Sequence, residues 1–184
     1  MGIQDRVGWA QAALLFAACG AASSQLLNLG DWGLVLLPVP FGVLAAWLCV
    51  GRVRPGLALV VLDACAWQTA YRVAGRLGTE SGAARKVLAM CLAGLIGGFG
   101  VALAAALTKR RAASAANLAT AAAAGAICGL PFAAWLITGN EAPLPEWAEM
   151  MVSFGIWQGA VGLDLWRNFR VASVERASVA SPAD

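Results

Sequence analysis

The chain has 184 residues, of which 60% are hydrophobic and 12% are charged, and its formal net charge is +3 at pH 7. Its mean hydropathy is +0.73. Because soluble domains contain about half apolar and about a quarter charged residues, this composition argues against a soluble globular protein and predicts a membrane protein. The sequence contains no histidine, which excludes histidine-based catalytic triads and metal sites within the chain.

Six apolar stretches follow one another along the chain, at about residues 8–29, 33–50, 56–76, 87–107, 113–138 and 147–166. Each is close to the length of about 20 residues that a helix needs to cross a bilayer. We therefore predict an all-α, polytopic protein with six transmembrane helices, forming a single integral membrane domain. The remaining residues, 167–184, are predicted to form a polar cytoplasmic tail.

Three of the stretches carry small residues four positions apart: Ala13, Ala17 and Ala21 in the first, Gly94 and Gly98 in the fourth, and Gly125 and Gly129 in the fifth. Small residues at this spacing let helix backbones approach closely inside a membrane. We interpret them as packing contacts within the bundle. The alternative is that the row in the first stretch docks another subunit.

The second and fifth stretches both end in Ala-Ala-Trp-Leu-x-x-Gly-x-x-x-Pro, with Trp47 in the first copy and Trp135 in the second. A Pro-Phe pair precedes each copy, and Pro38, Pro40 and Pro131 predict bends in both helices. The copies end the second and the fifth span, and an odd number of crossings reverses the direction of the chain, so the two copies would point in opposite directions. This predicts a 3+3 inverted repeat, residues 8–76 and 87–166, as in many transporters. The alternative is independent use of Trp, Gly and Pro at helix ends.

The third stretch contains an acidic residue, Asp63, well inside its apolar length. A carboxyl group at such a depth is costly unless it is paired, protonated or hydrated. Asp63, Trp67 and Tyr71 would share one helix face, and this face would suit a cavity for a cationic or aromatic small molecule. The alternative, equally open, is a hydrogen bond between Asp63 and a polar residue of another helix: Gln11, Gln25, Asn28 or Asn117.

The sixth stretch repeats the Trp-Gln-x-Ala sequence of the third, which is a further match between the two proposed repeats. From the polar and aromatic residues of these two stretches we predict a ligand site between the third and sixth helices, with an acidic counter-charge, aromatic walls and two hydrogen-bonding amides. Its residues are Asp63, Trp67, Gln68, Tyr71, Trp157 and Gln158. The leading hypothesis for function is a small-molecule transport or substrate-binding component without catalytic residues.

Asp164, also in the sixth stretch, raises a second hypothesis. Two aspartates that share a proton can activate water, so Asp63 and Asp164 would be the catalytic pair of an intramembrane protease. The residues around them do not reproduce the Gly-x-Gly-Asp or Asn-x-x-Asp patterns of aspartyl membrane proteases, and Arg167 offers Asp164 an ion pair. A third hypothesis is a non-catalytic assembly or structural subunit.

The distribution of charge predicts an orientation. With the N-terminus inside, nine of the thirteen basic residues are cytoplasmic: Arg6, Arg52, Arg54, Lys109, Arg110, Arg111, Arg167, Arg170 and Arg176. The positive-inside rule then places both termini in the cytoplasm. The acidic residues Asp31, Glu141, Glu146 and Glu149 fall outside. One segment departs from the rule, because Arg72, Arg76, Arg85 and Lys86 would also lie outside.

The five cysteines, Cys19, Cys49, Cys65, Cys91 and Cys128, lie singly in separate stretches. The sequence has no Cys-x-x-Cys pair and no glycine-rich phosphate loop after a strand. We expect no metal, no cofactor and no nucleic-acid partner. The expected partners are the lipid bilayer, a small-molecule ligand, and either a membrane partner subunit or further copies of the chain.

Two family resemblances add to these expectations. The segment Trp47-Leu-Cys-Val-Gly51-Arg-Val-Arg-Pro55 and the glycines between Arg85 and Gly129 resemble small six-helix membrane proteins of GC-rich bacteria, over about residues 40–129. That resemblance implies a bacterial inner membrane and no particular activity. In size, helix count and its alanine-rich first helix, the chain also resembles S components of energy-coupling-factor vitamin transporters. This implies a vitamin-sized ligand bound from outside, and docking of a coupling subunit through Ala13, Ala17 and Ala21. An inverted repeat is not a mark of that family.

Overall fold

The computed structural model describes residues 7–50, 53–78, 82–109, 114–138 and 144–179, with side chains as far as residue 168. All regular structure in these ranges is helical, which confirms the predicted all-α class. The elements are α1 (Trp9–Ser24), the 3-10 helix η2 (Gln25–Leu29), α2 (Asp31–Leu36), α3 (Val39–Ala45), the π-helical turn η3 (Ala46–Val50), α4 (Val53–Gly78), α5 (Ala83–Thr108), α6 (Ala115–Ile127), α7 (Leu130–Thr138) and α8 (Glu146–Val179).

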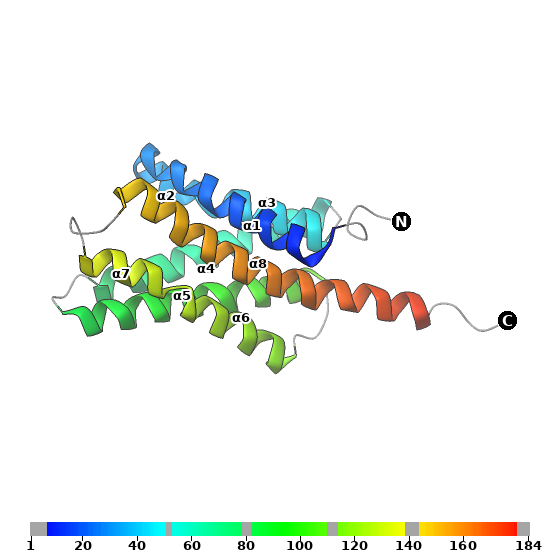
Figure 1. Cartoon of the computed structure of the whole chain (residues 1–184). Coiled ribbons are helices and arrows are strands. Elements are labelled where there is room, and N and C mark those ends of the chain that lie inside the picture. Colours follow the sequence, from blue (N-terminus) through cyan, green and yellow to red (C-terminus); the bar gives the residue numbers. More distant parts are fainter. Residues whose placement is uncertain (1–6, 51–52, 79–81, 110–113, 139–143, 180–184) are drawn as a thin grey trace.

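These elements form six roughly antiparallel rods: α1–η2, α2–α3–η3, α4, α5, α6–α7 and α8 (Figure 1). We call the end of the bundle where α1 begins and α8 ends the termini end. The opposite end, where α4 and α7 end and α5 and α8 begin, is the loop end (Figure 1). The first helix, α1, packs mainly against the last, α8, while α5 lies between α4 and α6.

The bundle has the outer surface of a membrane protein. Within the described ranges, four helical segments are long and apolar enough to cross a membrane: Trp9–Leu29, Asp31–Val50, Ala83–Thr108 and Ala115–Thr138. Large apolar side chains face outward, among them Leu14, Trp32 and Ile127, each at least 66% exposed. An exposed apolar surface of this kind suits a lipid environment. The remaining long helices, α4 and α8, carry the polar residues predicted for the ligand site.

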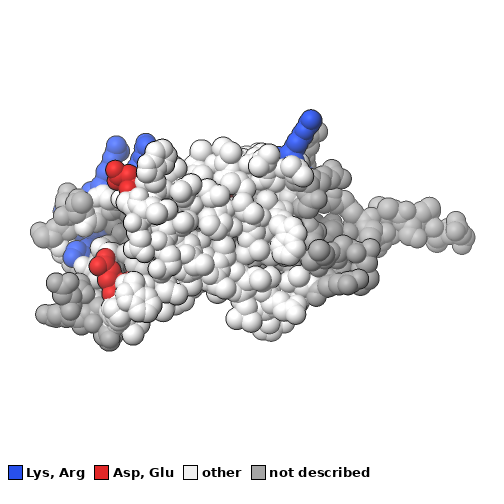
Figure 2. All heavy atoms as spheres, turned by 90° about the horizontal axis from the view of Figure 1, so that it is seen from above, with Lys and Arg blue, Asp and Glu red and all other residues white. Residues whose placement is uncertain are grey.

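Charged side chains collect at the two ends of the molecule. Figure 2 shows one face, on which Lys, Arg, Asp and Glu side chains lie at the ends and an uncharged surface lies between them. The helix boundaries place Arg54, Lys109 and Arg167 toward the termini end, and Asp31 and Glu146 at the loop end. Arg6, Arg52, Arg110, Arg111 and Glu141 lie outside the described residues, as do the side chains of Arg170 and Arg176.

The second and fifth rods are each interrupted near a proline. In the second rod, α2 ends at Leu36 and α3 begins at Val39, with Pro40 in its first turn. In the fifth rod, α6 ends at Ile127 and α7 begins at Leu130, one residue before Pro131. Proline lacks a backbone N–H and is tolerated in the first turn of a helix, where that donor has no partner within the helix. The predicted bends are therefore breaks between two short helices.

Glycines bring α5 and α6 into direct backbone contact. A methyl group added at Gly94 would collide with the carbonyl oxygen of Gly125, and one added at Gly98 would collide with that of Ala121. The same holds for Gly129 and the carbonyl oxygen of Met90 on α5. Lipid removes the hydrophobic drive between helices, so close backbone packing of this kind contributes much of their association.

The alanine row of α1 faces α8 within the same chain. A methyl group added at Gly159 would lie 3.2 Å from the side chain of Ala17 and 3.6 Å from the carbonyl oxygen of Ala13, and one at Gly155 would lie 3.9 Å from the side chain of Ala21. All three alanines are half-buried. The geometry thus gives the row a packing role inside the bundle.

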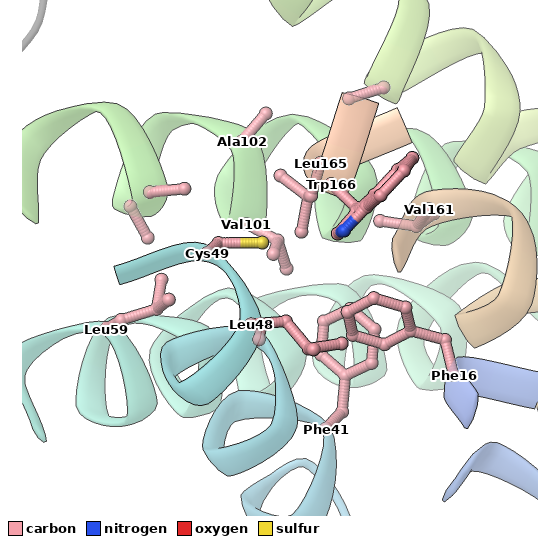
Figure 3. Packing of buried hydrophobic residues seen from close by; sticks show 14 of the residues in the cluster. Phe16, Phe41, Leu48, Cys49, Leu59, Val101, Ala102, Val161, Leu165 and Trp166 are labelled. Atoms are coloured by element: carbon pink, nitrogen blue, oxygen red, sulfur yellow. The ribbon is translucent and has the colours of Figure 1, made fainter. Parts of the chain in front are cut away.

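The apolar core lies where α1, α3, α4, α5 and α8 meet. Phe16 and Phe41 are buried with ring centroids 5.3 Å apart, and Leu48, Val161 and Leu165 lie in the same cluster (Figure 3). Phe16 also fills the space left by Gly162, where a methyl group would collide with its ring. Aromatic rings at this separation add to the stabilisation that burial of their surface provides.

Lys86 links the loop ends of α5 and α7. Its Nζ atom donates a hydrogen bond of 2.7 Å to the carbonyl oxygen of Leu136, in the last turn of α7. The last carbonyls of a helix lack partners within the helix and carry partial negative charge. Lys86, one of the four basic residues that depart from the predicted charge distribution, therefore caps the C-terminal end of α7.

We expect Lys86→Met to destabilise the protein by about 1 kcal/mol, because it removes this charged donor from the helix terminus. Arg72→Met is the matched control, since Arg72 is an exposed basic residue of the same end. Thermal unfolding in detergent, followed by circular dichroism, measures both. Equal effects of the two substitutions would contradict the capping role of Lys86.

The last helix is longer than predicted. The sixth apolar stretch was expected to end at residue 166 and a polar tail to follow, but α8 continues to Val179. The added segment contains Ala172, Glu175, Arg176 and Ala177, and these residue types favour helix. Hydropathy predicts where a membrane span ends, but a helix can continue beyond that point.

Candidate functional site

A cavity of about 360 Å³ lies in the loop-end half of the bundle, between α4, α5, α7 and α8. Residues of η2 and α2 complete its wall. Six aromatic side chains line it: Trp67, Tyr71, Phe132, Trp135, Phe154 and Trp157. The rest of the wall is aliphatic or small, including Met90, Met150 and four glycines, and contains no charged side chain. Its volume is within the range of about 300–1,000 Å³ that is usual for small-molecule sites.

The aromatic rings form a continuous series from the cavity into the core. Phe132 and Phe154 have ring centroids 4.9 Å apart, and Phe154 and Trp67 are 5.5 Å apart. Trp67 then meets Trp157 edge-on at 6.3 Å. Trp157 lies 6.0 Å from Phe41, the residue that packs on Phe16. Trp67 and Trp157 thus stand between the cavity and the apolar core, and we call this pair the aromatic floor.

Three of the six residues predicted for the site line the cavity, namely Trp67, Tyr71 and Trp157. Gln68 is engaged elsewhere, because its Nε2 atom donates a hydrogen bond of 3.0 Å to the carbonyl oxygen of Leu34. Asp63 and Gln158 are not part of the wall, and both are 2% exposed. The structure therefore gathers the predicted aromatic side chains around the cavity and leaves the predicted polar ones outside its wall.

Asp63 lies near the middle of α4, against α3. A methyl group at Gly42 would lie 3.0 Å from its Oδ2 atom, so the glycine provides the space for the carboxyl group. Within the described residues, Oδ2 has no hydrogen-bond partner. The hydrogen bonds expected from Gln11, Gln25, Asn28 or Asn117 are not among its contacts; Gln11, for instance, accepts from the backbone of Gly8 instead.

Unpartnered polar atoms are concentrated on the two helices predicted to form the site. In the described part of the chain, four buried side-chain atoms lack a hydrogen-bond partner: Asp63 Oδ2 and Trp67 Nε1 on α4, and Glu149 Oε2 and Gln158 Oε1 on α8. Buried polar atoms are nearly always hydrogen-bonded in folded proteins, and each exception calls for an explanation. All four residues either line the cavity or lie within one helical turn of a residue that does.

Asp164 has other surroundings. Its Oδ2 atom accepts a hydrogen bond from Asn168 Nδ2 at 3.0 Å and one from the Thr120 hydroxyl of α6 at 3.4 Å. Asp63 instead lies against α3. The structure therefore places the two carboxyl groups of the protease hypothesis against different helices, with no hydrogen bond between them.

Several cavity residues were not predicted from the sequence. Phe132 belongs to the Pro-Phe pair before the second copy of the repeated motif, and Trp135 belongs to that copy; the sequence interpretation assigned neither residue to the site. The two copies differ in environment, because Trp135 lines the cavity while Trp47 is half exposed. Phe154 precedes Trp157 by three residues, and this helical spacing could have identified it.

Comparison of the chain with protein-family models, curated proteins and solved structures gave no match. Among the described residues, no three Cys, Asp or Glu side chains lie together as a metal site requires. All five cysteines are free thiols, and Cys49 and Cys128 are buried.

Proposed function

We propose that this protein is a membrane-embedded binding or transport component, and that its ligand is a small apolar or aromatic molecule held in the cavity between α4 and α8. One observation carries the proposal: six aromatic side chains from α4, α7 and α8 converge on a single cavity. Ligand sites are typically concave, mainly apolar and equipped with a few polar groups that orient the ligand. The Tyr71 hydroxyl and the indole N–H groups of Trp135 and Trp157 are polar groups of the wall side chains, whereas the Trp67 Nε1 atom is buried.

The wall favours a neutral ligand over a charged one. It contains no carboxylate, and Asp63 is buried against α3 and is not part of the wall. The rings would also accept a lipophilic cation, because an aromatic face attracts positive charge. Testing a cationic probe beside a neutral one distinguishes these two chemistries.

We also propose that all six rods cross the bacterial inner membrane, with the termini end in the cytoplasm. The support comes from the whole sequence, in which nine of the thirteen basic residues fall on the side assigned to the cytoplasm. Among the described residues, Arg54, Lys109 and Arg167 lie toward the termini end, and Arg72, Arg76, Arg85 and Lys86 at the loop end. The buried positions of Asp63 and Gln158 support a membrane-spanning role for α4 and α8, since their polar groups are shielded from lipid. The cavity would then lie in the outer half of the membrane.

Three features support an inverted repeat. The Ala-Ala-Trp-Leu part of the first motif copy lies in α3 and η3 toward the termini end, and that of the second copy lies in α7 at the loop end (Figure 1). The rods α2–α3 and α6–α7 are both interrupted on the N-terminal side of the motif. The corresponding residues Trp67 and Trp157 touch each other, as residues close to a two-fold axis do. If the protein works alone, rocking of the two halves about this contact would give alternating access.

The proposal is tested by filling the cavity. Ala74 lines it, whereas Ala58 on the same helix is exposed and lies outside it. We expect Ala74→Trp to abolish binding of 4-fluorotoluene, because the indole occupies the space that the probe needs, and Ala58→Trp to leave binding unchanged. Fluorine NMR of the detergent-purified proteins measures the bound probe, and the control accounts for probe dissolved in the micelle.

Native mass spectrometry of the wild-type protein adds a readout that needs no chosen probe. A retained small molecule that is lost in Ala74→Trp and kept in Ala58→Trp would support the cavity as the binding site. Binding of a lipophilic cation, tetraphenylphosphonium, in preference to 4-fluorotoluene would move the ligand class from neutral to cationic. Equal binding of all probes by the two variants would contradict the proposal.

A further inference from the structure

Two unpartnered polar side chains adjoin the residues of the aromatic floor along α4 and α8. Asp63 precedes Trp67 by one helical turn on α4, and Gln158 follows Trp157 on α8. Each is 2% exposed, and each has a side-chain oxygen without a hydrogen-bond partner among the described residues. The indole Nε1 atom of Trp67 also lacks a partner. Asp63, Trp67 and Gln158 thus each have a buried polar atom without a hydrogen-bond partner among the described residues.

This arrangement suits a group that exchanges a proton. Burial of an unpaired carboxylate costs far more free energy than burial of a neutral carboxylic acid. With the floor closed, Asp63 is therefore held best as the neutral acid. A carboxyl group whose only role were structural would be expected to have a partner at this depth. Asp164, which has hydrogen bonds from Thr120 and Asn168, shows what such a partnered group looks like in this protein.

We infer that Asp63 is a proton-binding site whose access is controlled by the aromatic floor of the cavity. When the rings of Trp67 and Trp157 separate, the O–H bond of the Asp63 carboxyl group breaks and its proton passes to water that enters from the cavity. The carboxylate left behind can accept a hydrogen bond from Trp67 Nε1. When the floor closes, the carboxylate takes a proton back from water. This inference rests on the proposed function, and it adds proton coupling to ligand binding.

The groups around Asp63 leave it without a fixed counter-charge. No residue of α3 is titratable, and the Cys19 thiol of α1 is within electrostatic range of the carboxyl group. On the other elements around α4, the described titratable and charged side chains are Cys49 of η3, Arg85, Lys86 and Cys91 of α5, Lys109 at the end of α5, and Glu146, Glu149, Asp164 and Arg167 of α8. Lys86 is engaged with Leu136, and Asp164 is directed toward α6.

Infrared spectroscopy tests the protonation directly and needs no ligand. The protein is reconstituted in vesicles of phosphatidylethanolamine and phosphatidylglycerol, and the carbonyl band of protonated carboxylic acids is recorded as a function of pH. We expect a band at neutral pH that Asp63→Asn removes and Asp164→Asn leaves in place. A band of full intensity in Asp63→Asn, or no such band in the wild-type protein, would overturn the inference.

Substitutions in the cavity wall test the control of access. We expect Trp67→Ala to admit water, so that the carbonyl band disappears at a pH that is lower than in the wild-type protein by about one unit or more. Trp67→Phe keeps a ring but removes the N–H donor to the carboxylate, and it should move the loss to higher pH. Trp135→Ala, in the same cavity but away from the floor, is the control and should have no effect.

Equal shifts in Trp67→Ala and Trp135→Ala, or none in either, would overturn the gating role of the floor. These measurements involve no ligand, so their failure is distinct from a failure of the probe-binding experiment. A protein that binds 4-fluorotoluene but lacks the Asp63 band has a binding cavity without a proton site.

Discussion

Replacing Gly94 with alanine is expected to destabilise the folded bundle by about 1–3 kcal/mol, the usual cost of overpacking. A methyl group at this position would collide with the carbonyl oxygen of Gly125. A carbonyl oxygen belongs to the backbone and cannot move aside as the end of a flexible side chain does, so α5 and α6 must separate. Their separation would also loosen the cavity wall, since Gly94 lines the cavity.

The matched control is Gly75→Ala. Gly75 lies in α4 and also lines the cavity, but a methyl group there meets no atom within 4 Å. Alanine favours helix over glycine by up to about 1 kcal/mol, so this variant should be as stable as the wild-type protein or more stable. Thermal unfolding of both variants in detergent, followed by circular dichroism, measures the difference. A Gly94→Ala protein as stable as Gly75→Ala would show that the α5–α6 contact does not depend on this glycine.

The sequence was most informative where one physical requirement dominates. Apolar length predicted the rods, and small residues four positions apart predicted the contact between α5 and α6, because only backbone-sized groups fit there. Proline predicted the two interrupted rods. Helical spacing also brought Trp67 and Tyr71 to one face, and both line the cavity. Each of these predictions depends on local geometry, which the order of residues determines directly.

The remainder of the site depends on how the helices rotate against one another. Gln68 was predicted to meet a ligand, but its helix face turns it to the carbonyl oxygen of Leu34. Asp63 shares a face with Trp67 in the sequence pattern, yet the close approach of α3 at Gly42 encloses it. Trp135 is a tryptophan at a helix end, and its sequence position alone cannot distinguish a lipid interface from a cavity wall. Such choices are made by packing between distant segments.

Replacing Asp63 with alanine is expected to stabilise the folded protein by about 1–3 kcal/mol, because it removes a buried polar group that has no partner. The same change at Asp164 should be destabilising by a similar amount, because Thr120 and Asn168 lose their shared acceptor. Thermal unfolding in detergent at neutral pH measures both variants. A gain in stability at Asp63 and a loss at Asp164 would indicate that Asp63 is retained for function and Asp164 for structure.

Loss of stability in Asp63→Ala would contradict this interpretation, since it would show that the carboxyl group has a stabilising partner in the folded protein. A gain in stability, together with the loss of the protonated-acid band, would mean that the protein keeps Asp63 at a cost in folding free energy. Residues that lower stability in this way are characteristic of functional sites. An unpaired carboxyl group is especially costly in a membrane. Proton exchange by Asp63 is the function that best explains why the protein keeps a carboxyl group at this position.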